Sequence, residues 1–433
     1  INNNIFAEPL PEDEFQEVSR DGIKIDAKKN SEPEIAEVLL AKYKAVSYSG
    51  KLYWFENGEF IADEEKLKRL VFAEVGLMKT RFVDEIIKQM KYRAPLVADK
   101  IFDIKLQNGI LRQGHFIEVD FQEFTPYSIN IPYDPEAEAV PIVDDYLNHL
   151  TNNDPDYRNR LLEVMSHPLI VDKDFKRLLA KFFIMVGDGG NGKGTFLLII
   201  RKILGYKNCT GLSIKNMTDE RYFTTMQGKL VNLGDDVQDE AINNEQMKQI
   251  KNISTCDYVA ARNLFEQSKE VELTLSLIFT SNHMLKSFEK GESYKRRVDW
   301  LPMYGKPAKK DKNFIAKLTT PAALEYWMKL IVEAYQRLYK NQSFTESELV
   351  AAFNDEYHQN NNTVLQYLGD YEKAFFLNKR SPECYEDYEV WATDNGLSVQ
   401  SRKLFVQSVY DVFGLVLHPK KINGKTARVF IEK

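Results

Sequence analysis

A glycine-rich run, GDGGNGKGT, is the part of this sequence whose residue types and spacing most clearly suit chemistry. It follows the apolar run Phe182–Val186 and precedes an amphipathic stretch that extends to about Leu204. Glycines let successive backbone N–H groups turn inward around a phosphate, and a helix that follows directs its positive end at the same group. Lys193 would add a positive charge for the terminal phosphate oxygens. We therefore predict a phosphate-binding loop whose contacts come from Gly187, Asp188, Gly189, Gly190, Asn191, Gly192, Lys193, Gly194 and Thr195.

This loop departs from the usual pattern at one position. Ser or Thr normally follows the lysine and binds magnesium, but here Gly194 takes that place and Thr195 comes one residue later. Two alternatives remain open from the sequence. Either Thr195 binds Mg²⁺ through a shifted loop, or Mg²⁺ is bound mostly through water and acidic side chains.

A second apolar stretch, Lys229–Val237, contains two consecutive acids. Nucleotide hydrolysis needs carboxylates near the metal and the attacking water. We assign Asp235 to the magnesium shell and Asp236 to polarising the water. Because adjacent strand residues point to opposite faces, the two acids can share one site only if the strand has ended by Asp235.

Two further polar signals follow along the chain. The apolar stretch 274–280 ends in Ser281 and Asn282, and Asn282 is a candidate to position the attacking water and to sense the terminal phosphate. Arg296 and Arg297 precede another apolar run and are candidates for an arginine finger, donated by a neighbouring subunit to the transferring phosphate. Their order in the chain does not show which of the two is the finger.

The elements that must position these residues form an α/β pattern. Apolar runs at 182–186, 230–233, 273–280 and 298–303 alternate with helical stretches, which predicts a parallel sheet. Residues 156–181 and most of 314–368 read as helical. From 385 onward, two helices and a β-hairpin predict a winged helix. The predicted division is a linker (1–20), an N-terminal α+β module (21–155), an ATPase core (156–320), a helical part of the motor (321–368) and a winged-helix-like domain (369–433).

Composition excludes several classes of protein. The chain has 433 residues and a net charge of −6, so nucleic acid would have to bind to local basic surface. Its three cysteines, Cys209, Cys256 and Cys384, lack zinc-binding or disulfide-framework spacing, and a reducing, cytosolic setting is expected. No apolar run approaches the ~18 residues of a membrane span, so we expect no membrane partner. The polar, acidic N-terminus is not that of a signal peptide, and the start at Ile1 instead of Met suggests a piece of a longer protein.

The order and spacing of these motifs resemble superfamily 3 helicases, in particular the helicase part of phage, plasmid and poxvirus primase–helicases. The segments NGILRQG and IPYDPEAEAVP resemble the module that precedes the motor in that family. Residues 247–265 are similar to the family's additional motif, which leads into a DNA-contacting hairpin. Asp257 and Arg262 match that motif, whereas Cys256 replaces the glycine expected before the acid. The hairpin would span 263–272, and Lys269 matches the basic residue that faces the central pore.

This resemblance implies an AAA+-like motor that hydrolyses Mg²⁺-ATP, forms a homo-hexamer and moves 3′ to 5′ on single-stranded and fork DNA. It also implies a primase or polymerase domain upstream in the full-length chain and, for a phage or plasmid protein, the bacterial cytoplasm. Expected DNA contacts are Lys269, Arg262 and, on the hairpin of the winged helix, Lys420, Lys421 and Lys425. That hairpin would either bind duplex DNA or pack against the motor. The alternative functions are an ATP-switched replication initiator or loader and, less favoured by Asn282 and the paired arginines, a metabolic phosphotransferase.

Overall fold

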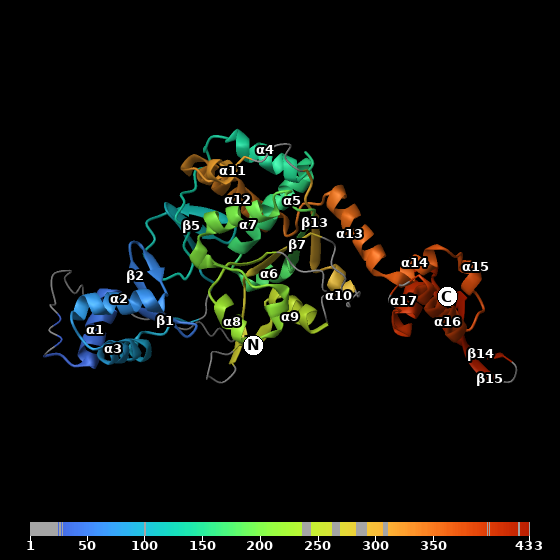
Figure 1. Ribbon diagram of the computed structural model, residues 1–433, viewed down its shortest axis with the longest axis horizontal. Helices are drawn as coiled ribbons and strands as arrows, with labels where there is room; N and C mark the ends of the chain where they lie inside the picture. The colour runs from blue at the N-terminus through green and yellow to red at the C-terminus, as the bar shows by residue number, and fades with distance from the viewer. Residues whose placement is uncertain are drawn as a thin grey trace, which may run out of the picture. The chain divides into compact units, whose positions relative to one another are not determined.

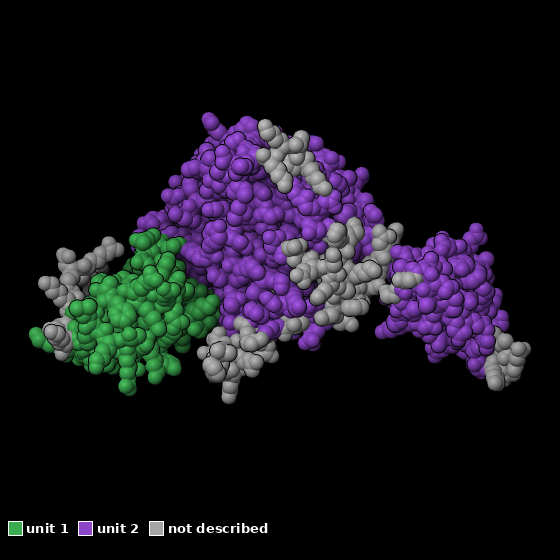
Figure 2. Space-filling view, in the orientation of Figure 1, with its two compact units in different colours: residues 1–100 green, residues 101–433 purple. Residues whose placement is uncertain are grey.

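The computed structural model describes residues 25, 27, 29–98, 101–235, 244–261, 269–282, 292–305, 311–395, 397, 399–422 and 425–432. It divides into two compact units, residues 1–100 and 101–433 (Figure 2). The strands β4–β6 and the helix α4 therefore belong to the unit that contains the parallel sheet. The domain boundaries predicted at residues 20, 155, 320 and 368 stay predictions.

The first unit is a small α+β fold. Its core consists of apolar side chains from three helices and a three-stranded antiparallel sheet. The turn between the second and third strands uses Asn57 and Gly58, both with positive φ (51° and 84°), as the Asn-Gly pair predicts. The elements are α1 (Glu32–Lys42), β1 (Val46–Tyr48), β2 (Lys51–Glu56), β3 (Glu59–Ile61), α2 (Glu64–Val75) and α3 (Thr80–Arg93).

The second unit contains a five-stranded sheet in the order β13-β7-β12-β9-β8, with every neighbouring pair parallel. The predicted α/β fold with a parallel sheet is therefore confirmed. All residues of the central strands are buried, as expected for strands covered on both faces. The strands are β7 (Phe182–Val186), β8 (Cys209–Thr210), β9 (Val231–Gly234), β12 (Ser276–Ser281) and β13 (Val298–Pro302).

Helices cover both faces of this sheet (Figure 1). On one face, Phe182, Ile184 and Phe279 pack in a cluster with Met247 and Ile250. The helices on that side are α8 (Glu220–Met226), α9 (Asn244–Ser254) and α10 (Glu292–Lys295). The helices on the other side include α5 (Pro155–Ser166), α7 (Lys193–Leu204) and α12 (Pro321–Asn341).

The predicted helix over 156–181 is wrong in one respect, because it is interrupted. α5 ends at Ser166, a short 3-10 turn covers His167–Leu169, and α6 begins at Lys173 and ends at Leu178. Pro168 lacks the N–H that would continue the α-helical hydrogen bonds, and the backbone becomes extended at Ile170 (ψ 103°). This break creates a separate short helix beside the start of β7.

The remaining elements of the second unit surround the sheet or follow it. A three-stranded antiparallel sheet precedes it, and a two-stranded ribbon lies between α9 and β12. The elements before and within the motor region are β4 (Ile104–Leu106), β5 (Gly109–Arg112), β6 (His115–Glu118), α4 (Pro141–Leu150), β10 (Tyr258–Ala261), β11 (Lys269–Glu272) and α11 (Phe314–Leu318). Those that follow α12 are α13 (Glu348–Asn361), α14 (Thr363–Gly369), α15 (Lys373–Phe376), α16 (Ser381–Asp394), α17 (Arg402–Phe413), β14 (Leu415–Ile422) and β15 (Lys425–Glu432).

Within the described part of the chain, no helix combines the length and the apolar character that a membrane crossing requires.

Candidate functional site

Three predicted positions meet at the carboxyl edge of the parallel sheet. β12 lies between β7 and β9, and its register pairs Ser281 with Val186 of β7 and Phe279 with Gly234 of β9. The residues that follow these strands are therefore neighbours: Gly187 after β7, Asn282 after β12 and Asp235 after β9. A hydrogen bond from Gly187 N to Ser281 O (3.3 Å) joins the first two strands at this edge.

The glycine-rich loop is ordered by its own side chains. Lys193 is 7% exposed, and its ammonium donates hydrogen bonds to the carbonyl oxygens of Gly187 and Asp188 and to Asn191 Oδ1. Asn191 Nδ2 in turn donates to Met303 O just after β13 (3.0 Å). A Cβ at Gly187 would lie 1.9 Å from that same nitrogen, so only glycine fits there. The loop is thus held against the end of β13, the strand that pairs with β7.

The helix α7 begins directly at Lys193. Gly192 is its N-cap in a left-handed conformation (φ 96°), which strongly favours glycine. The Gly192 carbonyl accepts hydrogen bonds from Phe196 N (2.9 Å) and from the hydroxyl of Tyr146 on α4 (3.0 Å). The first backbone N–H groups of an α-helix have no partner within the helix, so this end suits an anion.

Gly194 and Thr195 occupy the first turn of α7. Gly194 is exposed, and a Cβ at this position would meet no heavy atom within 4 Å. Thr195 is half-buried. Successive residues of a helix are turned by about 100° from one another, so the Thr195 side chain leaves the helix in a different direction from that of residue 194.

Asp235 lies beyond the end of β9, which satisfies the condition set by the strand geometry. Its Oδ1 accepts a 2.7 Å hydrogen bond from Thr280 Oγ1 on the middle strand. Sequence reasoning missed Thr280, although a hydroxyl two residues before Asn282, near the end of the same strand, was a usable signal. Gly234 is required because a Cβ there would lie 2.5 Å from the ring of Phe279. Asp236 lies outside the described residues.

The two arginines lie at the opposite end of the strands, where β7 and β13 begin. Val298 pairs with Phe182, the first residue of β7, and Arg297 O accepts a 2.8 Å hydrogen bond from Phe182 N. Five strand residues separate this edge from Gly187, a rise of roughly 16 Å. Arg296 is exposed and Arg297 is half-buried. The structure therefore does not bring either arginine to the glycine-rich loop of its own chain.

The predicted hairpin is partly described. β10 and β11 form an antiparallel pair whose last described partners are Ala261 and Lys269. The first arm begins at Tyr258, upstream of the predicted start at Asn263, and Lys269 is the first residue of the returning arm. Arg262 and residues 263–268 lie outside the described residues. The returning arm leads to β12 after three residues, so the hairpin and Asn282 share one continuous segment.

The base of this hairpin is attached to α6. Cys256 (φ 52°) lies two residues beyond the end of α9, where Asp257 N donates a hydrogen bond to Asn252 O (2.8 Å) and Cys256 N donates one to Ile253 O (3.0 Å). This pattern usually places glycine at the position of Cys256, which explains the glycine expected there. Arg177 of α6 donates to Thr255 O (2.9 Å) and Cys256 O (3.2 Å).

A second contact from α6 reaches the returning arm. Lys173 Nζ lies 2.9 Å and 3.1 Å from the two carboxylate oxygens of Glu272 on β11. Between Lys173 and Arg177, the ammonium of Lys176 is 1% exposed and donates to His167 O and Ile170 O. Burial lowers the pKa of Lys176 to about 8.

The C-terminal elements form a core of their own around α14, α16, α17 and the β14–β15 pair. A single antiparallel bridge joins Arg380 to Val429 of β15. Lys420 and Lys421 are exposed on β14, and Lys425 pairs with Ile422 at the end of the described pairing. Lys420 Nζ donates a 3.2 Å hydrogen bond to Asn378 Oδ1.

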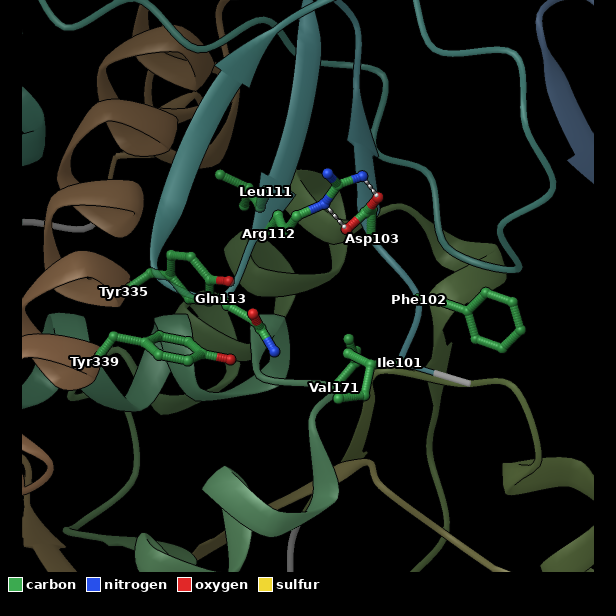
Figure 3. Close-up of a pocket in the computed structure, with 9 residues that line it drawn as sticks. All are labelled: Ile101, Phe102, Asp103, Leu111, Arg112, Gln113, Val171, Tyr335 and Tyr339. Atoms are coloured by element: carbon green, nitrogen blue, oxygen red, sulfur yellow. Dashed lines mark hydrogen bonds and ion pairs between the residues drawn. The ribbon is translucent and has the colours of Figure 1, made fainter. Parts of the chain in front are cut away.

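Two other features carry no predicted role. Among the residues that the structure describes, no cluster of three His, Cys, Asp or Glu side chains is arranged to bind a metal. A small pocket lies between β5 and α12 (Figure 3), and its two charged side chains, Arg112 and Asp103, form an ion pair. Arg112 binds Asp103 through two hydrogen bonds (2.9 and 2.6 Å), and Tyr335 accepts one from Gly114 N (3.1 Å).

Comparison with known proteins shows similarity in fold and one family match. Residues 185–297 match the model of a family described as "Family of unknown function (DUF5906)". No curated protein matches the chain. The A form apo structure of the NrS-1 C-terminal region is 13% identical, with a TM-score of 0.53, over 94% of this chain and 100% of that one. A second apo structure of that region (305–718) is 14% identical, with a TM-score of 0.50 and the same coverage. At these identities the similarity shows that the folds are alike.

Proposed function

We propose that this chain is an ATP-dependent DNA helicase that works as a ring of identical subunits in phage- or plasmid-type replication. The observation that supports it best is the meeting of the glycine-rich loop, Asp235 and Asn282 at one edge of the sheet. A phosphate-binding loop, an acid and a water-positioning amide are the parts that nucleotide hydrolysis needs within one chain. The resemblance of these motifs to superfamily 3 helicases supports the DNA substrate.

The residues at this edge fit a nucleoside triphosphate. At the start of the loop, a Cβ on Gly187 would collide with Asn191. Further along, a Cβ on Gly190 or Gly194 would meet no heavy atom within 4 Å, which leaves open space beside the loop. Backbone N–H groups at the start of α7 would bind the phosphates, and Lys193 would exchange its loop acceptors for phosphate oxygens. This loop is proposed to be a P-loop.

Magnesium ions prefer oxygen ligands, and bound Mg²⁺ would neutralise charge on the phosphate oxygens. Asp235, which follows β9 at the same end of the sheet, would supply a carboxylate oxygen, and Thr280 fixes its orientation. Because Thr195 leaves α7 in a different direction from residue 194, we favour the alternative in which Mg²⁺ is bound through Asp235 and water. Asn282 would position the attacking water beside it.

The arginine finger, in this proposal, comes from the neighbouring subunit. Arg296 and Arg297 begin at the far edge of their own sheet, about 16 Å from their own loop by strand rise. Arg296 is the exposed one and is therefore the better placed to enter another subunit's site. The finger also requires that subunits assemble with this edge of one facing the loop of the next.

The β10–β11 hairpin would contact single-stranded DNA and transmit its movement to the sheet. Its returning arm, β11, is joined by three residues to β12, and Asn282 follows β12. The segment between Lys269 and Asn282 therefore links the proposed DNA contact with the proposed sensor of the terminal phosphate. An initiator or loader that only switches state would not need DNA to accelerate its ATP turnover.

The deciding experiment measures Mg²⁺-ATP hydrolysis with and without single-stranded DNA, together with unwinding of a forked duplex. Wild type should hydrolyse ATP faster with DNA and unwind the fork. Lys193→Ala should lower hydrolysis by about 100-fold or more, whereas Lys202→Ala, on the exposed side of the same helix, serves as the matched control. Lys269→Ala should lower the ratio of the rates with and without DNA. The contrary outcome is that wild type hydrolyses ATP at a rate that DNA does not change and leaves the forked duplex paired. That outcome would replace the helicase function with the initiator or loader function.

A further inference from the structure

The helix α17 presents a polar face to solvent. Phe405, Ser408 and Val409 are buried against the C-terminal core. On the opposite side of the helix, at spacings of three and four residues, lie exposed polar side chains: Lys403, Gln407, Tyr410 and Asp411. This face is not needed for packing within the described chain.

The chemistry of this face suits the edges of DNA bases. Gln407 Nε2 donates a 2.8 Å hydrogen bond to Asp411 Oδ1, which fixes the orientation of the amide. A glutamine can pair with adenine and an aspartate can accept from cytosine in the major groove. A surface that only neutralised phosphates would not contain Asp411, because a carboxylate repels phosphate. The mixture of donors and acceptors therefore favours contact with bases.

The neighbouring helix α16 is unsuited to this task. Its exposed residues include Glu383, Glu386 and Asp387, all negatively charged at neutral pH. These carboxylates would be repelled by a DNA backbone. Of these two helices, α17 is therefore the better suited to approach DNA.

The β14–β15 hairpin projects beyond these helices (Figure 1), and its register divides its basic residues between two faces. Leu417 pairs with Phe430, and both pack in the C-terminal core. Two residues further along, Arg428 pairs with Pro419 and lies on that same face, as does Lys421 beyond it. Lys420 lies on the other face, where it contacts Asn378. Among the described basic residues of the hairpin, Lys421 and Arg428 are thus the two on the face that packs against the helices.

We propose that the C-terminal region binds duplex DNA with a sequence preference. α17 enters the major groove, where Gln407 and Asp411 contact base edges, and Lys421 and Arg428 contact phosphates. The order of helix α16, helix α17 and hairpin fits the way helix-turn-helix proteins place their second helix in the groove. This site is separate from the proposed nucleotide site and does not depend on it.

The test uses the full chain without nucleotide, so that failure of the motor proposal would not affect it. A pool of duplexes with a randomised 12-base-pair centre is selected for binding and sequenced. Wild type should enrich a common motif. Gln407→Ala and Asp411→Asn should weaken or change that motif, because each removes a base contact. Tyr388→Phe, which alters a buried hydroxyl of the same core, should enrich the wild-type motif and so control for folding.

Fluorescence anisotropy with a random-sequence duplex at several salt concentrations tests the hairpin. Lys421→Ala and Arg428→Ala should each reduce the slope of log affinity against log salt by about 1. Lys420→Ala should reduce it by less than half as much. The proposal is overturned if wild type enriches no motif, or if Lys420→Ala changes the slope as much as Lys421→Ala does.

Discussion

Thr280 Oγ1 donates a 2.7 Å hydrogen bond to Asp235 Oδ1, and this bond joins two adjacent parallel strands where both end. Thr280 is 1% exposed, so its hydroxyl is fixed by the sheet and not by solvent. The bond orients one carboxylate oxygen of Asp235. The position of Asp235 is thus set by the strand between it and the glycine-rich loop.

Thr280→Val should lower the rate of Mg²⁺-ATP hydrolysis by about tenfold, because a hydrogen bond to a charged group contributes about 1.5–3 kcal/mol. Thr280→Ser retains the hydroxyl and should remain close to wild type. Steady-state hydrolysis at several Mg²⁺ concentrations measures both. A valine variant as active as the serine variant would show that Asp235 needs no such orientation.

Two glycines of the loop should respond oppositely to alanine. A Cβ at Gly187 would lie 1.9 Å from Asn191 Nδ2 and 2.9 Å from Met303 O, so Gly187→Ala should lower the free energy of unfolding by about 1–3 kcal/mol. Gly194→Ala meets open space on α7 and should raise it by about 0.5–1 kcal/mol. Urea unfolding of both variants measures this. Equal changes in the free energy of unfolding would contradict the close contact of Gly187 with Asn191 and the open space at Gly194.

Much of the fold could be predicted from the sequence where an apolar run is bounded by clear signals. β7 has the predicted bounds Phe182–Val186, because five apolar residues end at a glycine loop. β8 was not predicted, since Cys209–Thr210 is only two residues long and half-buried. The order of the strands also could not be predicted, because it depends on which crossovers pack together.

The candidate site shows the same division between local and tertiary information. The residue types of Lys193 and Asp235 follow from the motifs, which are local. The partners that orient them, such as Thr280 and Tyr146, come from elements brought near by the register of the sheet and the packing of α4. The location of Arg296 at the far edge is likewise a consequence of the pairing of β13 with β7.

Subunit mixing should show whether the finger acts between chains. Lys193→Ala and Arg296→Ala should each be inactive alone, yet a mixture should recover hydrolysis, because some interfaces then combine an intact loop with an intact arginine. Mixing Lys193→Ala with Asp235→Ala should recover nothing, since those two residues belong to one chain's site. Recovery in both mixtures, or in neither, would contradict the assignment of Arg296.

The buried Lys176 should make stability depend on pH in a defined direction. Its pKa is about 8 in the folded chain, against an ordinary value of 10.5, because burial disfavours the charged amine. Between these values the unfolded chain binds the proton and the folded chain does not, so stability rises with pH. Relative to Lys176→Met, the free energy of unfolding of wild type should rise by about 3 kcal/mol as the pH increases across this range. Urea unfolding at pH 7 and pH 10 measures the change, and a constant difference between the two proteins would contradict it.

Arg177 should control how firmly the β10–β11 hairpin is attached to the motor. Its guanidinium contacts the carbonyls of Thr255 and Cys256 in the turn that precedes β10. Arg177→Ala removes these contacts and the 3.4 Å contact with Asp257 Oδ1. It should lower the stimulation of ATP hydrolysis by DNA more than it lowers the rate without DNA. In Arg177→Lys, the ammonium can contact only one of the two carbonyls. The stimulation of its ATP hydrolysis by DNA should therefore lie between that of Arg177→Ala and that of wild type. The exposed Lys340 of α12 provides a matched Lys340→Ala control. Equal loss of both rates in Arg177→Ala would mean that Arg177 supports the fold as a whole and not the coupling of the hairpin to the nucleotide site.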